Sequence, residues 1–137
     1  MKESDRCLIS KIKFDESEFF IFNVYAPCVS AEKPLFFNDI ACNIADLQLN
    51  EDSNLIVLGD FNTVFNKELD NISGIPHSDA IISTFRNLIN TSLLVDIWRE
   101  SHGIQKEYTW CKHNPYFIAR RLDYIFVKTA KWKLTEK

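Results

Sequence analysis

The N-terminal part of the chain carries a hydrophobic pattern typical of β-strands. Apolar and polar side chains largely alternate over Cys7–Phe14, and residues 19–25 are dense in aromatic and β-branched side chains. Both patterns favour strands, and the polar residues 15–17 between them favour a turn. The sequence therefore predicts a β-hairpin in this region.

The apolar residues that follow are spaced as in a helix. Pro34 suits the first turn of a helix, and apolar side chains then recur at steps of three and four to about Leu49. Residues 55–58 are uniformly apolar, as in a strand that is buried on both faces. Strand, helix and strand over residues 19–58 form a βαβ unit, which places the two strands in parallel in one sheet.

The rest of the chain predicts a second helix and several short strands. Ser78 can cap a helix whose apolar side is formed by Ile81, Ile82, Phe85, Leu88 and Ile89. Residues 93–98, 108–111 and 122–127 are further strand or extended candidates. The chain shows no repeat and no linker, so residues 1–137 are expected to form a single domain of the α/β class.

Candidate chemistry gathers where the two parallel strands end. Their carboxyl ends share one edge of the sheet, where open α/β sheets hold their active sites, and this brings Tyr25 close to Asp60 and Asn62. Gly59 leaves space for a ligand or another backbone to approach. Two simpler interpretations stay open: an Asx turn that closes the strand, and a tyrosine that packs at the border of the core.

Asp123 is a second candidate because it lies among apolar residues near the end of the chain. An unpaired carboxylate in an apolar strand is costly, so Asp123 is expected to have a specific partner. That partner is either a neighbouring arginine or a catalytic histidine that the carboxylate orients. The sequence alone leaves both open.

Charge is unevenly distributed along the chain. The formal net charge is −3, but residues 106–137 hold eight Lys and Arg against three Asp and Glu, which gives 8 − 3 = +5. A basic section can face a polyanion, although the charge pattern taken alone favours an ordinary solvated surface. No signal peptide and no membrane-spanning apolar run is found, and the irregularly spaced cysteines favour reduced thiols, so an intracellular protein is expected.

Five motifs together resemble one protein family. They are NVYAP at 23–27, GDFN at 59–62, LVDIWR at 94–99, YTW at 108–110 and RLDYIF at 121–126. Their order and spacing resemble the endonuclease/exonuclease/phosphatase superfamily, most of all the endonuclease domain of non-LTR (LINE-type) retrotransposons. The resemblance implies a two-sheet α/β sandwich with helices packed outside, and Mg²⁺-assisted hydrolysis of a DNA phosphodiester.

The resemblance also implies a role for each catalytic candidate. Tyr25 would contact the scissile phosphate, and Asp60 would position the attacking water. Asn62 would stabilise the transition state, with Asp60 and Asn62 at the metal. Asp123 would orient a histidine, whereas Asp96 is expected to cap or brace local structure.

Three further residues are candidates for contact with substrate. Thr109 matches a threonine near the DNA-facing site of retrotransposon endonucleases, with a plain strand hydroxyl as the alternative. Arg120 and Arg121 are candidate DNA contacts of the basic section. DNA is then the expected partner, and the nucleus is the location that the resemblance implies.

The chain also departs from the family pattern. The glutamate that is the family's principal metal ligand and the Ser-Asp-His motif are not found in it. We therefore expect an incomplete domain that is inactive on its own, with an exposed sheet edge that favours self-association. The alternative is a non-catalytic remnant that binds nucleic acid or another partner; other members of the superfamily, such as repair endonucleases, deadenylases and phosphoinositide phosphatases, remain open.

Overall fold

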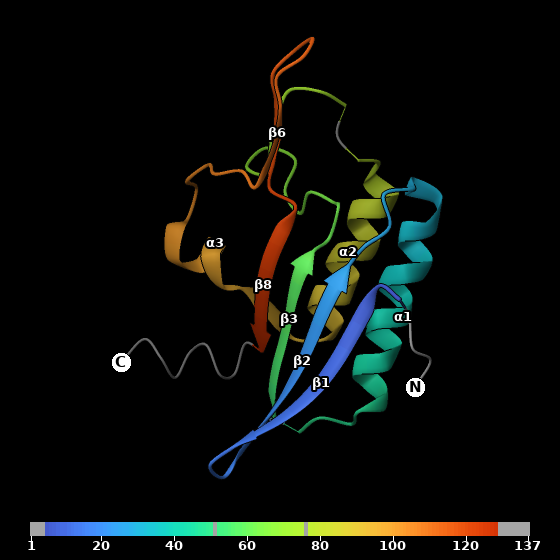
Figure 1. Ribbon diagram of the computed structural model, residues 1–137, viewed down its shortest axis with the longest axis vertical. Coiled ribbons are helices and arrows are strands. Elements are labelled where there is room, and N and C mark those ends of the chain that lie inside the picture. The colour runs from blue at the N-terminus through green and yellow to red at the C-terminus, as the bar shows by residue number, and fades with distance from the viewer. Residues whose placement is uncertain (1–4, 51, 76, 129–137) are drawn as a thin grey trace.

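The computed structural model describes residues 5–50, 52–75 and 77–128, which form strands, helices and one short 3-10 turn (Figure 1). In chain order these elements are β1 (Cys7–Phe14), β2 (Ser17–Tyr25), η1 (Ser30–Glu32), α1 (Lys33–Asp46), β3 (Asn54–Asp60), β4 (Asn71–Ile72), α2 (Asp79–Thr91), β5 (Leu94–Asp96), α3 (Ile97–His102), β6 (Trp110–Lys112), β7 (Ile118–Arg120) and β8 (Asp123–Lys128).

Two sheets carry these strands. The larger sheet has the order β1-β2-β3-β8-β5, and the smaller sheet has the order β4-β7-β6. β1 and β2 form the predicted antiparallel hairpin, and β2 pairs with β3 in parallel across the α1 connection. The predicted βαβ unit and the α/β class with two sheets are therefore confirmed.

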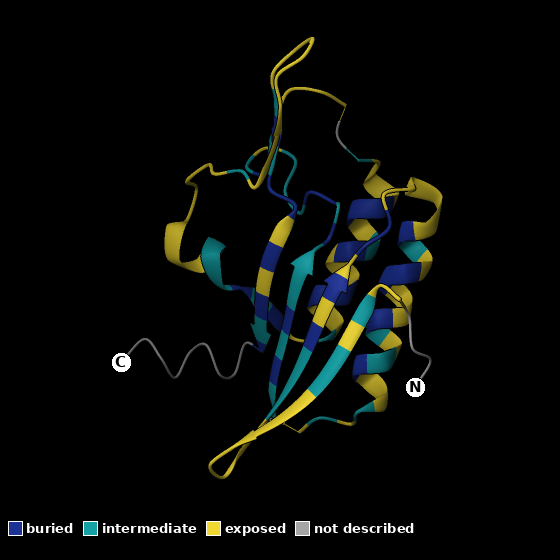
Figure 2. Ribbon diagram, viewed as in Figure 1, coloured by how far each residue is buried: buried dark blue, intermediate teal, exposed yellow. Residues whose placement is uncertain are grey.

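The core lies between one face of the larger sheet and the helices α1 and α2. Phe22 and Val24 of β2 and Leu55 and Val57 of β3 are buried on this face, and both helices turn their buried sides toward it (Figure 2). Phe85 of α2 stacks on Phe37 of α1 and on Phe61, with ring centres 5.0 and 4.9 Å apart. Aromatic packing of this kind adds to the area buried by the helices.

The opposite face of the larger sheet is far more open. Leu8 is 65% exposed, Ile12 48% and Ile125 47%, although all three are strand residues (Figure 2). Within residues 5–50, 52–75 and 77–128, α3 borders this face where it contacts β8, together with the loop residues 107–109. The sheet thus has one face packed against helices and one largely apolar face that those residues leave accessible.

One predicted strand is shorter than expected. Residues 93–98 were predicted to be extended, but β5 covers only Leu94–Asp96, and α3 begins at Ile97. The cause is Asp96, whose Oδ1 accepts a hydrogen bond of 3.1 Å from the Arg99 amide and so caps α3. The expected capping role of Asp96 is confirmed, as is that of Ser78, which caps α2. Among the described helices, none has the length and apolar character needed to span a membrane.

Candidate functional site

The predicted catalytic residues meet at one end of the larger sheet. Tyr25 of β2 pairs in register with Asp60 of β3, which in turn pairs with Asp123 of β8. Paired residues on neighbouring strands point to the same face, so the three side chains lie side by side. Asn62 follows two residues after Asp60. We call these four residues, Tyr25, Asp60, Asn62 and Asp123, the rim.

The turn after β3 keeps Asp60 and Asn62 together by an unexpected route. Asn62 does not continue the extended strand, because its φ is 46°, in the left-handed region. Its amide N–H donates to Asp60 Oδ1 at 2.8 Å, which is the Asx turn of the simpler interpretation. The Asn62 side-chain Nδ2 donates to the Ala26 carbonyl at 2.8 Å, and Ala26 directly follows Tyr25. The turn is thus tied to both parallel strands.

The surroundings of Asp60 favour this carboxylate as a proton acceptor. Burial raises the pKa of the Asp60 carboxyl, and the negative charge of Asp123 adds to this rise, while the Asn62 amide and the charge of Lys33 oppose it. Asp123 is itself exposed, contrary to the expectation of a carboxylate enclosed in an apolar strand. Within the described residues, neither an arginine nor a histidine hydrogen-bonds to the Asp123 carboxylate.

The oxygen atoms of the rim suit a hard cation. Asp60 keeps one carboxylate oxygen outside the Asx turn, and Asn62 keeps its amide oxygen because its Nδ2 faces the Ala26 carbonyl. Asp123 adds a second carboxylate. A cation between Asp60 and Asp123 would relieve the repulsion between the two carboxylates. Magnesium is commonly bound by one or two carboxylates, with water and substrate phosphate completing its shell. The described residues contain no group of three or more His, Cys, Asp and Glu that suits a metal ion.

Two residues behind the rim were not foreseen from the sequence. Lys33, at the start of α1, is only 1% exposed, and its Nζ donates to the Asn62 carbonyl and lies 3.0 Å from His77 Nε2. Burial lowers the pKa of Lys33 to about 8. No local pattern marks Lys33 as buried; the indirect signal is that α1 begins at the same sheet edge where Asp60 ends β3.

His77 gives the protein a specific pH dependence. Burial, with the charge of Lys33, lowers the pKa of His77 to about 4. Between about pH 6.5 and 4 the unfolded chain therefore binds a proton that the folded protein excludes, and stability falls as the pH is lowered. We expect this residue to account for a loss of about 1–2 kcal/mol, allowing for screening of the partly exposed ring.

The measurement is urea unfolding of the wild type and His77→Gln at pH 6.5 and 4.5. Other carboxyl groups titrate in the same range, so the informative quantity is the difference between the two proteins. The wild type should lose more stability than the variant. Equal losses would show that His77 is not held uncharged in the folded state.

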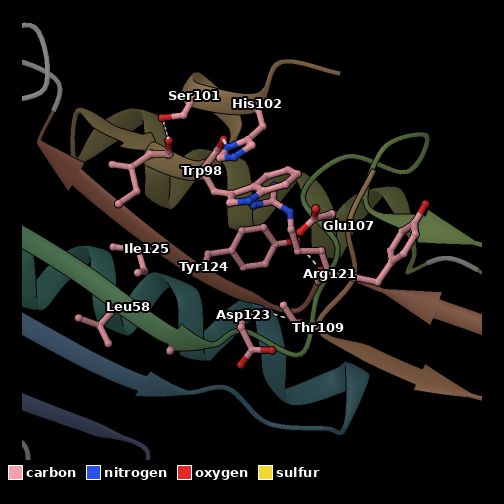
Figure 3. A pocket seen from close by; sticks show the side chains of 13 residues that line it. Leu58, Trp98, Ser101, His102, Glu107, Thr109, Arg121, Asp123, Tyr124 and Ile125 are labelled. Atoms are coloured by element: carbon pink, nitrogen blue, oxygen red, sulfur yellow. Dashed lines mark hydrogen bonds between the residues drawn. The ribbon is translucent and has the colours of Figure 1, made fainter. Parts of the chain in front are cut away.

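The expected DNA contact by Arg121 is not what the structure shows. Arg121 is 3% exposed, and its guanidinium donates to Asp70 Oδ1 at 2.8 Å and to Asp96 Oδ2 at 2.6 Å. It also lies between the rings of Trp98 and Tyr124, at 5.1 and 4.4 Å (Figure 3). Asp70, from a loop, and Asp96, at the end of β5, enclose the guanidinium, so in this structure the side chain braces the fold.

Arg120 and Thr109 also have internal partners. Arg120 donates to Asn71 Oδ1 at 3.2 Å and to the Ile75 carbonyl at 2.7 Å. Thr109 Oγ1 accepts the amide N–H groups of Leu122 and Asp123 at 3.0 and 3.2 Å (Figure 3). Thr109 lies just before β6 and is exposed beside the rim, so its hydroxyl supports the start of β8 and adjoins the site.

The basic section is less available to a polyanion than its sequence suggests. Arg121 is paired with carboxylates, and Lys128 is 7% exposed, with its Nζ donating to the Asn50 carbonyl. Lys106 and Lys112 are exposed, while Lys131, Lys133 and Lys137 lie outside the described residues. The described part of residues 106–137 therefore does not present a continuous basic face.

A pocket of about 590 Å³ opens between α3 and the accessible face of the sheet (Figure 3). Trp98 and His102 of α3 stack on one side, with ring centres 4.6 Å apart, and Leu58 and Ile125 line the other. Asp123 and Thr109 also line the pocket, so it adjoins the rim. Sequence reasoning did not predict it, because it depends on the position of α3.

Comparison with known proteins gives one sequence relative and several structural ones. No protein-family model matches the chain. A transposon TX1 uncharacterized 149 kDa protein of Xenopus laevis is 26% identical over 125 residues, which is 90% of this chain and 9% of that protein. The chain thus spans less than a tenth of the curated relative that it matches.

The structural relatives include AP endonucleases. The AP endonuclease LMAP of Leishmania major has a TM-score of 0.76 at 16% identity, over 91% of this chain and 46% of that one. TDP2 of D. rerio, solved with a single-strand DNA product, has a TM-score of 0.63 at 23% identity, over 92% and 47%. The chain therefore has the fold of the endonuclease/exonuclease/phosphatase superfamily, and its match to a transposon protein agrees with the retrotransposon-type resemblance of its motifs.

Proposed function

We propose that the rim is the phosphate-binding and metal-binding part of a Mg²⁺-dependent DNA phosphodiesterase of the retrotransposon endonuclease type. The observation that carries this proposal is the register Tyr25–Asp60–Asp123 across three neighbouring strands, with Asn62 beside them. A phenol, two carboxylates and an amide on one sheet edge supply donors and acceptors for a phosphate, a water and a hard cation. The structural likeness to AP endonucleases supports this chemistry, and the sequence match to a transposon protein supports the retrotransposon type.

Each rim residue has a role that fits its surroundings. Tyr25 is 53% exposed, so its hydroxyl is free to approach a phosphate oxygen, and the Arg6 guanidinium lies 5.6 Å from its ring centre. Asp60 accepts a proton from the attacking water, a role that the raised pKa of its carboxyl favours. Asn62 stabilises charge that develops on the phosphate.

The metal belongs at Asp60 and Asn62, with Asp123 adjacent. A magnesium ion held there neutralises phosphate charge and lowers the pKa of a bound water. We further propose that turnover by the isolated chain is below detection. The principal glutamate and the histidine motif that the resemblance implies are not found in its sequence, and members of such a catalytic unit act together.

The test follows the rim directly by NMR. Purified chain is titrated with Mg²⁺ and then with a DNA dodecamer, and the signals of Tyr25, Asp60 and Asn62 should shift together. In Asp60→Asn the apparent Mg²⁺ affinity should fall at least about tenfold. Asp79→Asn, which changes an exposed carboxylate on α2, should behave as the wild type. Absence of any shift at the rim would overturn the proposal.

A plasmid assay separates binding from turnover. Supercoiled plasmid is incubated with the chain and Mg²⁺, and we expect it to stay intact. Nicking that disappears in Asp60→Ala would support the phosphodiesterase chemistry but would show that the rim is sufficient on its own. Nicking that persists in Asp60→Ala would point to a contaminating nuclease.

A further inference from the structure

The buried amine behind the rim has an unusual environment. Lysine is rarely fully buried without a counter-charge, yet Lys33 is 1% exposed and forms no ion pair within 4 Å in the described part of the chain. Its two contacts are the Asn62 carbonyl and His77 Nε2. A buried cation of this kind costs stability, so its presence needs another explanation.

The contact with Asn62 supplies that explanation. Asn62 has a left-handed backbone, which costs a non-glycine residue about 1 kcal/mol or more and persists only when its surroundings hold it. Three hydrogen bonds do so: the amide N–H to Asp60, the side-chain Nδ2 to Ala26, and the carbonyl oxygen from Lys33. The first two come from the parallel strands, and the third comes from α1.

The three hydrogen bonds leave one polar group of Asn62 unused. A carbonyl can only accept, so the side-chain atom that faces the Ala26 carbonyl must be Nδ2. The amide oxygen is then turned away from the Ala26 carbonyl, and among the described residues it accepts no hydrogen bond. A change of backbone at Asn62 would move this oxygen, and the Lys33 bond is the one that fixes the carbonyl end of the residue.

His77 holds Lys33 in place. Nε2 of the ring lies 3.0 Å from the Lys33 amine and accepts its N–H when the imidazole proton is on Nδ1, and in that tautomer Nδ1 does not accept the Val64 amide 3.4 Å away. Lys33, Asn62 and His77 thus come from three segments, separated by 29 and 44 residues in sequence from Lys33. The arrangement joins the start of α1 to the turn that ends β3.

We propose that Lys33 is a positioning residue of the rim, which holds the left-handed Asn62 so that its amide oxygen faces the phosphate and metal, with His77 as the anchor of Lys33. The phosphate and metal in this statement rest on the proposed function. The hold on Asn62 itself does not, and it can be measured without DNA or magnesium.

The experiment compares Lys33→Met with Lys33→Arg and Lys128→Met. Lys128 is a matched control, because it is also a buried lysine whose Nζ donates to a main-chain carbonyl, that of Asn50. It lies at the end of β8 that is opposite the rim, since Asp123 begins this strand and Lys128 ends it. Amide hydrogen exchange and the side-chain NH₂ signal of Asn62 are followed by NMR. In Lys33→Met the Asn62 amide should exchange at least about tenfold faster, since its carbonyl is released.

Three further results are expected. Lys33→Arg should restore slow exchange at least in part, since a guanidinium still donates to the carbonyl. Lys128→Met should leave Asn62 unchanged. The urea midpoint of Lys33→Met should stay close to that of the wild type, because removal of the buried charge offsets the lost hydrogen bond to the Asn62 carbonyl. If Lys33 only stabilised the fold, Lys33→Met would instead lower the urea midpoint and would speed amide exchange in α2 and β8 as well as at Asn62.

The outcomes separate this inference from the proposed function. Unchanged Asn62 signals in Lys33→Met, or equal effects from Lys128→Met, would overturn the positioning role whatever the rim binds. If Lys33→Met does not fold, His77→Leu is used, which keeps the amine but removes its anchor; unchanged Asn62 exchange there would overturn the role as well. A third outcome is faster Asn62 exchange in Lys33→Met together with a wild type that binds neither Mg²⁺ nor DNA. That outcome would support the positioning of Asn62 by Lys33 and would reject the proposed function.

Discussion

Replacing Arg121 by methionine is expected to lower the free energy of unfolding by about 3–5 kcal/mol. Methionine is shorter and uncharged, so it removes the cation that lies between Asp70, which is fully buried, and Asp96, which is 7% exposed. Burial lowers the pKa of the Arg121 guanidinium, but the hydrogen bonds that it donates to Asp96 and Asp70 outweigh burial, so the pKa is raised. The loss is large because Asp96 keeps its desolvation cost without an ion-pair partner, and Asp70 keeps only Arg99, at 2.6 Å, as its cation.

Urea unfolding at neutral pH measures this loss. Lys67→Met is the control, since it removes a 2.6 Å ion pair with Asp79 that lies at the surface, and its urea midpoint should match the wild type. A change of less than about 1 kcal/mol in Arg121→Met would mean that Arg121 is not committed to the buried network. Arg121 would then return to the candidates for DNA contact.

The parts of this protein that were predictable from sequence depend on local periodicity. The alternation in β1 and β2, the helical spacing in α1 and the apolar run in β3 each report the burial of residues close in sequence. The neighbourhood of Tyr25 and Asp60 followed from one topological rule, that parallel strands joined by a helix end at the same edge. That rule needs no knowledge of any side-chain contact.

The parts that were missed depend on partners far away in the chain. Arg120 and Arg121 are adjacent and chemically identical, but only Arg121 is enclosed by carboxylates, from residues 51 and 25 positions earlier. Lys33 reads as a solvated residue at the start of a helix until the Asn62 turn, 29 residues later, is placed against it. The prediction for Asp123 was wrong in the opposite sense, because this residue is exposed and not enclosed. Its apolar neighbours suggested a strand covered on both faces, but one face of β8 is accessible.

Replacing Gly59 by alanine is expected to lower the free energy of unfolding by about 4 kcal/mol or more, or to prevent folding. The added Cβ would lie 2.0 Å from the Val24 carbonyl oxygen and 3.0 Å from the Val24 main-chain nitrogen and carbon. These atoms belong to β2, which pairs with β3 at this residue, so relief requires the two parallel strands to separate. The φ of Gly59 is +130°, which alanine also disfavours.

Gly103→Ala separates the two causes of this loss. Gly103 also has a positive φ, of +54°, but an added Cβ would meet no atom within 4 Å. Its replacement should therefore cost only the backbone term, about 1–2 kcal/mol. Urea unfolding and circular dichroism of both variants give the comparison. If Gly59→Ala were no more harmful than Gly103→Ala, β2 and β3 would be further apart than the structure has them. The close approach of Tyr25 to Asp60, on which the rim depends, would then be lost as well, because the Val24–Gly59 pair directly precedes the Tyr25–Asp60 pair in the register.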